Sequence, residues 1–199
     1  MAETIPASQR LPVGAMRHQA PGWWGVWCLI ATEAALFAYL LFSYFYLWAQ
    51  SHGGHWVPET PPLKIALPNT IILIASSFVL YWGESGIRKG KRLRLVLGVL
   101  IALVMGIVFV GLQGMEWHSK KFSLSDSAYA SSYFTTTGFH MAHVVVGLLV
   151  LATLLLWSLL GKFGPERHAA VSIGALYWHF VDVVWLFVFT TYYLLPRIT

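Results

Sequence analysis

Two pairs of ionisable side chains lie inside long apolar stretches of this chain. The pairs are His140-x-x-His143 and His179-x-x-Asp182, each with a spacing of three residues. In a helix this spacing places both members on one face, so each pair can act as a unit. Imidazole and carboxylate groups exchange protons, ligate metals and form strong hydrogen bonds. Such groups are expensive in an apolar layer unless they find partners or water, and we therefore treat them as candidate functional residues.

A further carboxylate, Glu33, is predicted at a similar depth. It follows Trp23 by ten residues, which is about 15 Å along a helix and near the middle of an apolar layer roughly 30 Å thick. The same rise per residue brings both pairs near mid-depth. We therefore expect a shared buried network across the first, fourth and fifth helices. Its members are Glu33, His140, His143, His179 and Asp182.

Three explanations of this network stay open on spacing alone. The three imidazoles and the carboxylate of the two pairs could hold a metal, although helix-bundle di-iron sites need more Glu residues than Glu33 alone supplies. Glu33 could instead exchange protons with the imidazoles. The plainest explanation is a satisfied hydrogen-bond network that holds the helices together.

The composition predicts the elements that must position these groups. The 199 residues are 57% hydrophobic and 11% charged, and five apolar stretches are near or above the roughly 20 residues that a spanning helix needs. Continuous apolar runs exclude a membrane β-barrel, whose strands alternate in polarity. We predict an all-α integral membrane protein, a bundle of five transmembrane helices. The stretches are Trp23–Trp48, Ala66–Gly83, Leu95–Met115, Ser132–Leu160 and Ala169–Leu195.

The basic residues predict the orientation of the bundle. Five of the 13 Lys and Arg residues occupy the short loop 88–94, which the positive-inside rule places in the cytoplasm. With five spans, the N-terminus is then cytoplasmic and the C-terminus outside. We expect a cytoplasmic arm over residues 1–21 and a single transmembrane domain over 22–199. No soluble basic module is left over, so nucleic-acid binding is not expected.

Four other polar residues near predicted helix ends have simpler expected roles. Glu116, preceded by Gln113, lies at the outer end of the third helix, where we expect a half-buried interface carboxylate. Glu84 and Arg88 are four residues apart at the other end of the second helix. This spacing is typical of an exposed ion pair of small energetic value.

The amino-acid sequences of several segments resemble those of subunit III of the haem–copper oxidases. Tyr177-Trp-His-Phe-Val-Asp-Val-Val-Trp-Leu-Phe187 is similar to that family's last helix, and Thr137-Gly-Phe-His-Met-Ala-His143 to its Gly-Phe-His-x-x-His segment. Pro68-Asn-Thr-Ile-Ile-Leu-Ile-Ala-Ser-Ser77 resembles its Leu-Asn-Thr stretch. Thr32-Glu33 matches the position of its buried, carbodiimide-reactive carboxylate, and Gln113 and Glu116 match its Leu-Gln-x-x-Glu helix end. The resemblance extends from about Gly22 to Leu195.

The resemblance implies a role without bond-making chemistry in this chain. Subunit III holds no cofactor, the haems and copper belonging to subunits I and II, so no metal site is expected here. It contacts subunit I laterally within a complex that also contains subunit II, supports proton uptake by subunit I and prolongs its working life. Bound phospholipid is also implied. Glu33 is the expected functional carboxylate, surrounded by the network of His and Asp residues.

One departure from the family is visible in the helix count. Longer members have seven helices, and this chain begins at what resembles their third, as in five-helix bacterial forms. We expect subunit III of a bacterial terminal oxidase in the cytoplasmic (inner) membrane, with cytochrome c as donor. The alternatives are a quinol oxidase subunit or an accessory protein of nitric oxide reduction. A stand-alone transporter would show an internal repeat or helices broken by Gly and Pro at mid-depth, and this sequence shows neither. A metalloenzyme would bind metal through the two pairs.

Overall fold

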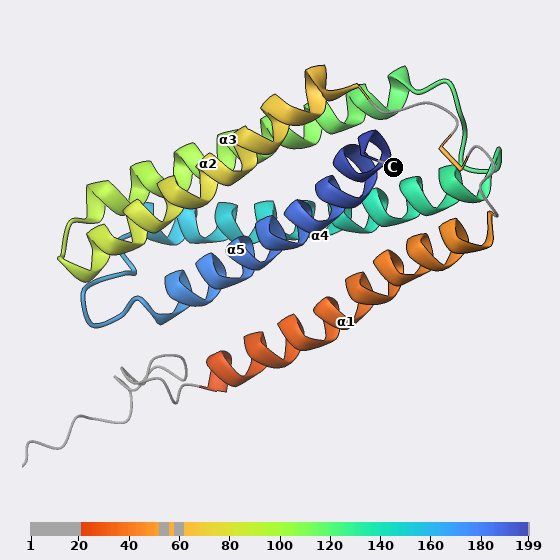
Figure 1. Cartoon of the computed structure of the whole chain (residues 1–199). Helices are drawn as coiled ribbons and strands as arrows, with labels where there is room; N and C mark the ends of the chain where they lie inside the picture. Colours follow the sequence, from red (N-terminus) through yellow and green to blue (C-terminus); the bar gives the residue numbers. More distant parts are fainter. Residues whose placement is uncertain (1–20, 52–55, 58–61, 199) are drawn as a thin grey trace, which may run out of the picture.

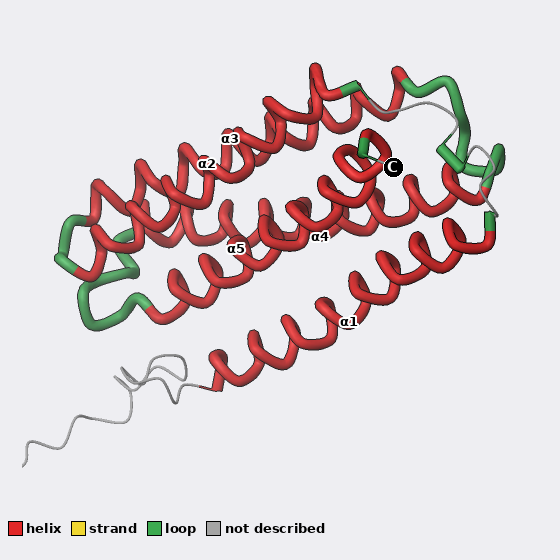
Figure 2. The backbone as a smooth tube through the Cα atoms, in the orientation of Figure 1, coloured by secondary structure: helices red, strands yellow, loops and turns green. Residues whose placement is uncertain are grey.

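Five long helices make up almost all of the described chain (Figure 1). The computed structural model describes residues 21–51, 56–57 and 62–198, so the predicted arm over 1–21 lies outside it except for Pro21. All five helices are long and apolar enough to cross a membrane, which confirms the predicted all-α bundle. No strand occurs among the described residues (Figure 2). The helices are α1 (Pro21–Gln50), α2 (Leu63–Arg88), α3 (Arg92–Ser119), α4 (Ala128–Leu159) and α5 (Ala169–Phe189).

The first three helices extend beyond the apolar stretches that predicted them, and α4 begins four residues earlier than predicted. A spanning backbone must satisfy its own hydrogen bonds, so these helices continue into their polar flanks. The fifth helix begins at the predicted Ala169 but ends as an α-helix at Phe189. We expected the proline-rich segment, Pro68 included, to delay the second helix until about Leu67. This expectation is wrong, because α2 begins at Leu63 and contains Pro68 in its second turn. Pro68 has no N–H to donate to the carbonyl four residues earlier, so α2 lacks one backbone hydrogen bond near its start.

The second and third helices form a tight antiparallel hairpin. Gly90 has a φ of 72°, a left-handed conformation that favours glycine and closes the turn between them. Farther along the two helices from this turn, Gly83 and Gly98 face each other so closely that a Cβ on Gly98 would lie 2.6 Å from the Gly83 Cα. Small residues at such a crossing let two backbones approach within the membrane. This hairpin forms one side of the bundle, beside α4 and α5 (Figure 1).

The helix α5 is central and α1 is peripheral. Of the most apolar 18-residue window in each, 61% is buried for α5 and 11% for α1. Two fully buried indoles of α5, Trp178 and Trp185, fill the space between the other helices. Their N–H groups donate to Ser76 Oγ at 2.9 Å and Thr70 Oγ1 at 3.0 Å on α2. The peripheral α1 packs mainly on α4 and α5.

Side-chain hydrogen bonds cap both ends of α4. Ser127 accepts from the Ala130 N–H at 3.1 Å at the start, and two hydrogen bonds from Ser123 hold the pKa of the nearby Asp126 carboxyl below its usual range. At the other end, Arg92 donates through Nε to the Ser158 carbonyl at 2.8 Å and through Nη2 to the Leu159 carbonyl. A guanidinium suits these carbonyls because they lack partners within the helix and carry partial negative charge.

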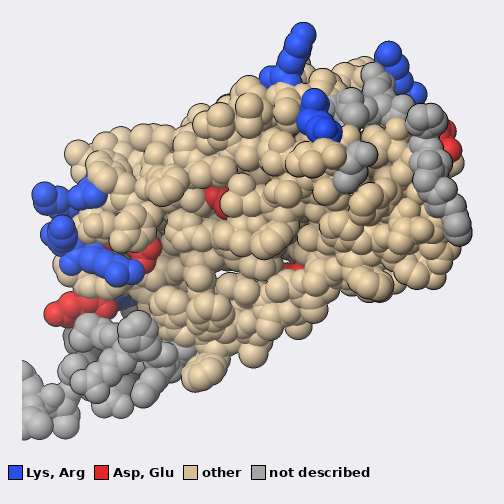
Figure 3. All heavy atoms as spheres, in the orientation of Figure 1, with Lys and Arg blue, Asp and Glu red and all other residues tan. Residues whose placement is uncertain are grey.

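The charged residues gather at the two ends of the bundle (Figure 3). We call the end with the loop 88–94 the basic end, and the other the opposite end. Between them the surface seen in Figure 3 is almost wholly uncharged, as expected of a face that meets lipid or another membrane subunit. A few acidic atoms interrupt this uncharged belt.

Candidate functional site

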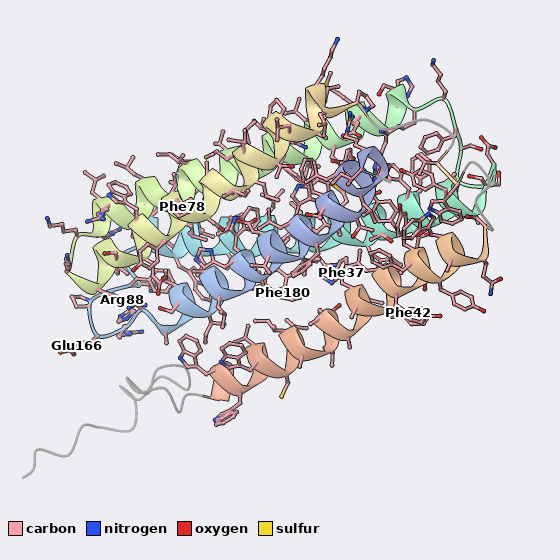
Figure 4. The ribbon with its side chains drawn as sticks, in the orientation of Figure 1. Phe37, Phe42, Phe78, Arg88, Glu166 and Phe180 are labelled. Carbon is pink, nitrogen blue, oxygen red and sulfur yellow. The ribbon has the colours of Figure 1, made fainter. Side chains whose placement is uncertain are left out.

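Glu33 on α1 is bonded to His143 on α4. Glu33 Oε2 lies 2.9 Å from His143 Nε2, and the two side chains keep 24% and 15% of their exposure. Phe37, one turn along α1 and buried against the bundle, packs edge-on at 5.1 Å between ring centroids against the His143 imidazole. Figure 4 shows Phe37 on the bundle side of α1 and Phe42 away from it. The phenylalanine therefore holds the imidazole in place beside the carboxyl group.

The second nitrogen of His143 limits the states of this pair. His143 Nδ1 lies 2.7 Å from the Phe139 carbonyl, and a carbonyl only accepts, so Nδ1 must carry a proton. The Nε2–Oε2 bond then holds one proton, which belongs either to an imidazolium facing a carboxylate or to a carboxylic acid facing a neutral imidazole. Moving that proton along one hydrogen bond converts one state into the other. The pair can therefore hold this one proton on either partner.

An apolar groove of about 580 Å³ lies between this pair and the basic end. It runs between α1, α4 and α5, with Leu29, Val146 and Tyr177 among its lining residues. Leu29 and Val146 lie about one helical turn from Glu33 and His143, so the pair sits at the deep end of the groove. Tyr177 donates to the His143 carbonyl at 3.2 Å. The pair is thus reached along an apolar surface and is bounded by a tyrosine.

His140 does not join the pair formed by Glu33 and His143. Its Nε2 donates to the Val181 carbonyl at 3.2 Å, and its ring lies 4.7 Å from the Trp185 ring. The side chain is 1% exposed. This imidazole therefore links α4 to the backbone of α5 inside the core.

His179 and Asp182 are linked through a serine of α2. Ser77 Oγ lies 2.8 Å from His179 Nδ1 and is also hydrogen-bonded to Asp182 Oδ2. Asp182 is 6% exposed, and its Oδ1 is buried without a hydrogen-bond partner among the described residues. The sequence analysis missed Ser77, because serine is common in helices and spacing does not reveal which helices face each other. The match of Ser76-Ser77 to a family segment was the signal available.

Bonds between α2 and α5 recur at regular intervals. Thr70, Ser77 and Glu84 are seven residues apart, the spacing that keeps side chains on one helix face. Their partners on α5 are Trp185, His179 and Ser172. Ser172 donates to Glu84 Oε1 at 2.6 Å, and Arg88 bonds the same oxygen at 2.5 Å. Glu84 is only 6% exposed, so the expected exposed ion pair is in fact anchored in the interface of α2 and α5.

Glu116 is fully buried, so the expected half-buried interface carboxylate is wrong. Lys120 Nζ lies 2.8 Å from its Oε1, and that lysine side chain is itself only 5% exposed. The same oxygen accepts from Tyr193 at 2.8 Å and Tyr133 at 3.3 Å. Gln113, one turn earlier, is buried against Tyr193 as well. We call Glu116, Lys120, Tyr133 and Tyr193 the tyrosine cluster.

A π-helical turn explains how the tyrosine cluster forms. After α5 the chain continues as η2 (Thr190–Leu194) and the short η3 (Leu195–Arg197). The wider turn of η2 buries two neighbouring tyrosines toward different helices. Tyr192 bonds Ser132 and Thr136 of α4, at 2.6 and 2.9 Å, while Tyr193 reaches Glu116 on α3. The change in helical pitch gave no sequence signal that we used.

The prediction of one shared network is therefore wrong. Hydrogen bonds divide its five members into the Glu33–His143 pair, a serine-bridged His179 and Asp182, and an isolated His140. Equal depth was insufficient, because the facing of each helix decides which side chains meet. In the described chain, no three His, Cys, Asp or Glu side chains come together as a metal-ligating group.

Comparisons with known proteins agree with this architecture. The family model described as cytochrome c oxidase subunit III matches residues 17–196. The chain is 37% identical to cytochrome c oxidase subunit 3 of Triticum aestivum over 167 residues, which are 77% of this chain and 63% of the relative. The protein of that name from Gallus gallus is 34% identical over 177 residues, 85% of this chain and 68% of the relative.

The matched relatives are longer than this chain. A third relative, cytochrome c oxidase subunit 3 of Tachyglossus aculeatus aculeatus, is 40% identical over 145 residues, 71% of this chain and 56% of its own length. The chain thus spans about three-fifths of the first of these relatives. The match nevertheless covers all five helices and every residue of the sites described above. This chain is a multi-pass membrane protein that belongs to the cytochrome c oxidase subunit III family.

Proposed function

We propose that this chain is the five-helix subunit III of a bacterial haem–copper terminal oxidase and supports proton uptake by its catalytic subunit. In this proposal it contacts subunit I laterally, in a complex that also contains subunit II, in the cytoplasmic membrane. The observation that supports it best is the Glu33–His143 pair, which holds one movable proton at the end of an apolar groove. The chain itself makes and breaks no covalent bond of the substrate.

The orientation follows from the charge distribution. Placing the basic end in the cytoplasm puts the N-terminus inside, the C-terminus outside, and the groove in the cytoplasmic half. The groove then leads from the proton-supplying side toward Glu33 and His143. Their partial exposure keeps them open to a neighbouring subunit or to lipid. Haem and copper belong to subunits I and II in this proposal, and this chain binds neither.

The groove suggests a lipid as a structural partner. Its walls come from three helices and are nearly all apolar, with Val26, Val150 and Ile173 among them. An acyl chain that fills such a space would brace the peripheral α1 against α4 and α5, with its phospholipid head group at the basic end. This arrangement would hold Glu33 beside His143 and so support the long working life proposed for subunit I.

The electron donor is proposed from the relatives' names. Both the family model and the matched proteins are named for cytochrome c oxidase, which favours cytochrome c over a quinol as donor. Donor docking belongs to another subunit, so the co-purified complex must decide. The copurifying haems and subunits would also distinguish an accessory protein of nitric oxide reduction.

The experiment is purification of the tagged chain from its native membrane in a mild detergent, followed by an optical spectrum and subunit identification. We expect a haem-containing large subunit and oxygen consumption with reduced cytochrome c. A colourless chain without partners under the mildest conditions would overturn the proposal. Glu33→Gln should lower the turnover rate of the assembled complex at alkaline pH, where proton uptake limits, while the exposed-loop control Glu166→Gln should not.

A further inference from the structure

We propose that Ser77, His179 and Asp182 form a second proton-holding site, in which the serine relays a proton between the imidazole and the carboxyl group. The site lies in the interface of α2 and α5 and shares no hydrogen bond with the Glu33–His143 pair. It rests on the proposed function for the use of the proton, but its chemistry follows from the geometry alone.

The number of protons on the Ser77 hydroxyl limits the states of this site. Its hydroxyl has one proton, yet Oγ contacts both His179 Nδ1 and Asp182 Oδ2. Ser77 must therefore donate to one of them and accept from the other. Donation to Asp182 requires a proton on His179 Nδ1. Donation to His179 requires a proton on Asp182 Oδ2.

These two arrangements differ by one proton. In the empty form Asp182 is a carboxylate and His179 is neutral with its proton on Nδ1. A proton that binds His179 Nε2 lets the Nδ1 proton pass to Ser77, while the serine's own proton passes to Asp182. The loaded form has a carboxylic acid, and His179 is again neutral, now with its proton on Nε2. Three bonds to hydrogen form, two break, and the site gains one proton.

The surroundings of Asp182 decide which form is favoured. Asp182 Oδ1 is buried and has no hydrogen-bond partner in the described part of the chain, and Asp182 has no ion pair there. An unpaired buried carboxylate is far more costly than a neutral acid. The charged group that interacts electrostatically with His179 is Glu84, which is seven residues from Ser77 on α2, toward the basic end. The nearby imidazole of His140 is bonded to the Val181 carbonyl of α5. Among the described residues no cation pairs with Asp182, so the loaded form is the resting one.

The side chains around the site indicate how protons reach it. The carboxylate of Glu84, bonded by Ser172 and Arg88, lies about 10 Å along α2 from Ser77, because seven residues separate them. The Glu84 carboxylate is thus a polar group that lies between the basic end and the site. His179 is partly exposed, whereas Asp182 is buried. Protons therefore enter and leave through the imidazole, and the carboxyl group stores them.

Nuclear magnetic resonance of ¹⁵N-histidine in the purified complex tests the relay without turnover. We expect the His179 proton to lie on Nε2 at neutral pH and to move to Nδ1 as the pH is raised. Infrared difference spectra should show the C=O band of protonated Asp182 disappearing over the same pH range. The His179→Gln variant assigns the nitrogen signals and Asp182→Asn assigns the carboxyl band.

The variants decide the outcome. Asp182→Asn should abolish the movement of the His179 proton between nitrogens, and Ser77→Ala should make the two signals titrate separately; if Asp182→Asn does not fold, Ser77→Ala alone decides. Unchanged signals in Ser77→Ala, or an Asp182 that is ionised at neutral pH, would overturn the inference. The control Glu33→Gln should leave both signals intact. A failure here leaves the turnover effect of Glu33→Gln untouched, and the reverse also holds.

Discussion

Glu33 and Glu116 are both carboxylates that accept a hydrogen bond from α4, yet their surroundings differ sharply. Glu116 is fully buried, lies 2.8 Å from the Lys120 ammonium and accepts from tyrosine hydroxyls. Glu33 keeps 24% of its side-chain exposure and has His143 as its bonded partner. Lysine keeps its proton far more firmly than histidine does. The charge of Glu116 is thus fixed by its partner, whereas that of Glu33 follows a proton that can move.

The difference separates a structural carboxylate from a candidate functional one. A buried ion pair surrounded by phenols joins α3, α4 and η2 and loses much if one partner is removed. A partly exposed carboxyl–imidazole pair contributes less to stability, and its shared proton can lie on either partner. The predictions below test this separation, from the largest expected effect on stability to the smallest.

Replacing Glu116 by Ala should destabilise the protein most. The change leaves the Lys120 ammonium buried without its anion, and breaking such a pair costs about 3–5 kcal/mol. Unfolding in dodecyl maltoside, followed by circular dichroism, measures the loss. The double change Glu116→Leu with Lys120→Met removes both charges and should recover most of the stability. If the double variant were as unstable as Glu116→Ala, the buried charge would not be the cause.

The two phenols of the tyrosine cluster should rank by their distances. Tyr193 lies 2.8 Å from Glu116 Oε1 and Tyr133 lies 3.3 Å from it. Hydrogen bonds to charged groups contribute about 1.5–3 kcal/mol, so Tyr193→Phe should approach that loss. Tyr133→Phe should lose less. The same unfolding measurement decides the order, and equal losses would mean that Glu116 does not distinguish the two hydroxyls.

Glu33→Gln should have a small effect on stability and a complete effect on chemical reactivity. Gln keeps an oxygen that accepts from His143, so we expect a loss of no more than about 1 kcal/mol. A hydrophobic carbodiimide reacts with protonated carboxyl groups and should label the parent protein but not this variant. Mass spectrometry locates the label. Equal labelling of both proteins, or labelling at Glu116, would break the distinction between the two carboxylates.

Tyr177→Phe should be nearly silent in stability. It removes a single 3.2 Å hydrogen bond to the His143 carbonyl at the edge of the groove, and a neutral bond of this kind contributes about 0.5–1.5 kcal/mol, with long bonds at the lower end. The unfolding midpoint in dodecyl maltoside reports it. A loss as large as that of Tyr193→Phe would show that the Glu33–His143 region is as tightly constrained as the tyrosine cluster.

The number and approximate position of the helices could be predicted because the membrane imposes a length. Each apolar stretch was near or above the required length, and the rise per residue placed Glu33 and both pairs of ionisable residues at similar depths. Rotation about each helix axis is not imposed by the membrane. The sequence analysis therefore identified the members of the sites without their pairing, and assigned His179 and Asp182 to a network with Glu33 when their partner is Ser77.

The prediction for Glu116 failed for a different physical reason. Position near a helix end normally means contact with water or head groups, and the prediction for Glu116 rested on that position. The chain instead continues past α5 through η2, which covers Glu116 with Tyr193. A change of helical pitch near the end of the chain depends on tertiary packing. Apolar periodicity gives no account of it.

The regular bonds between α2 and α5 have a consequence for how the chain is made. A nascent chain inserts α2 well before α5, so Thr70, Ser77 and Glu84 are in the membrane before their partners Trp185, His179 and Ser172 exist. Until α5 is made, α2 carries polar groups that lack their partners on that helix. A truncated product lacking α5 would never gain the α5 partners of these groups. The same bonds that align the finished helices thus mark an unfinished protein as a target for membrane quality-control proteases.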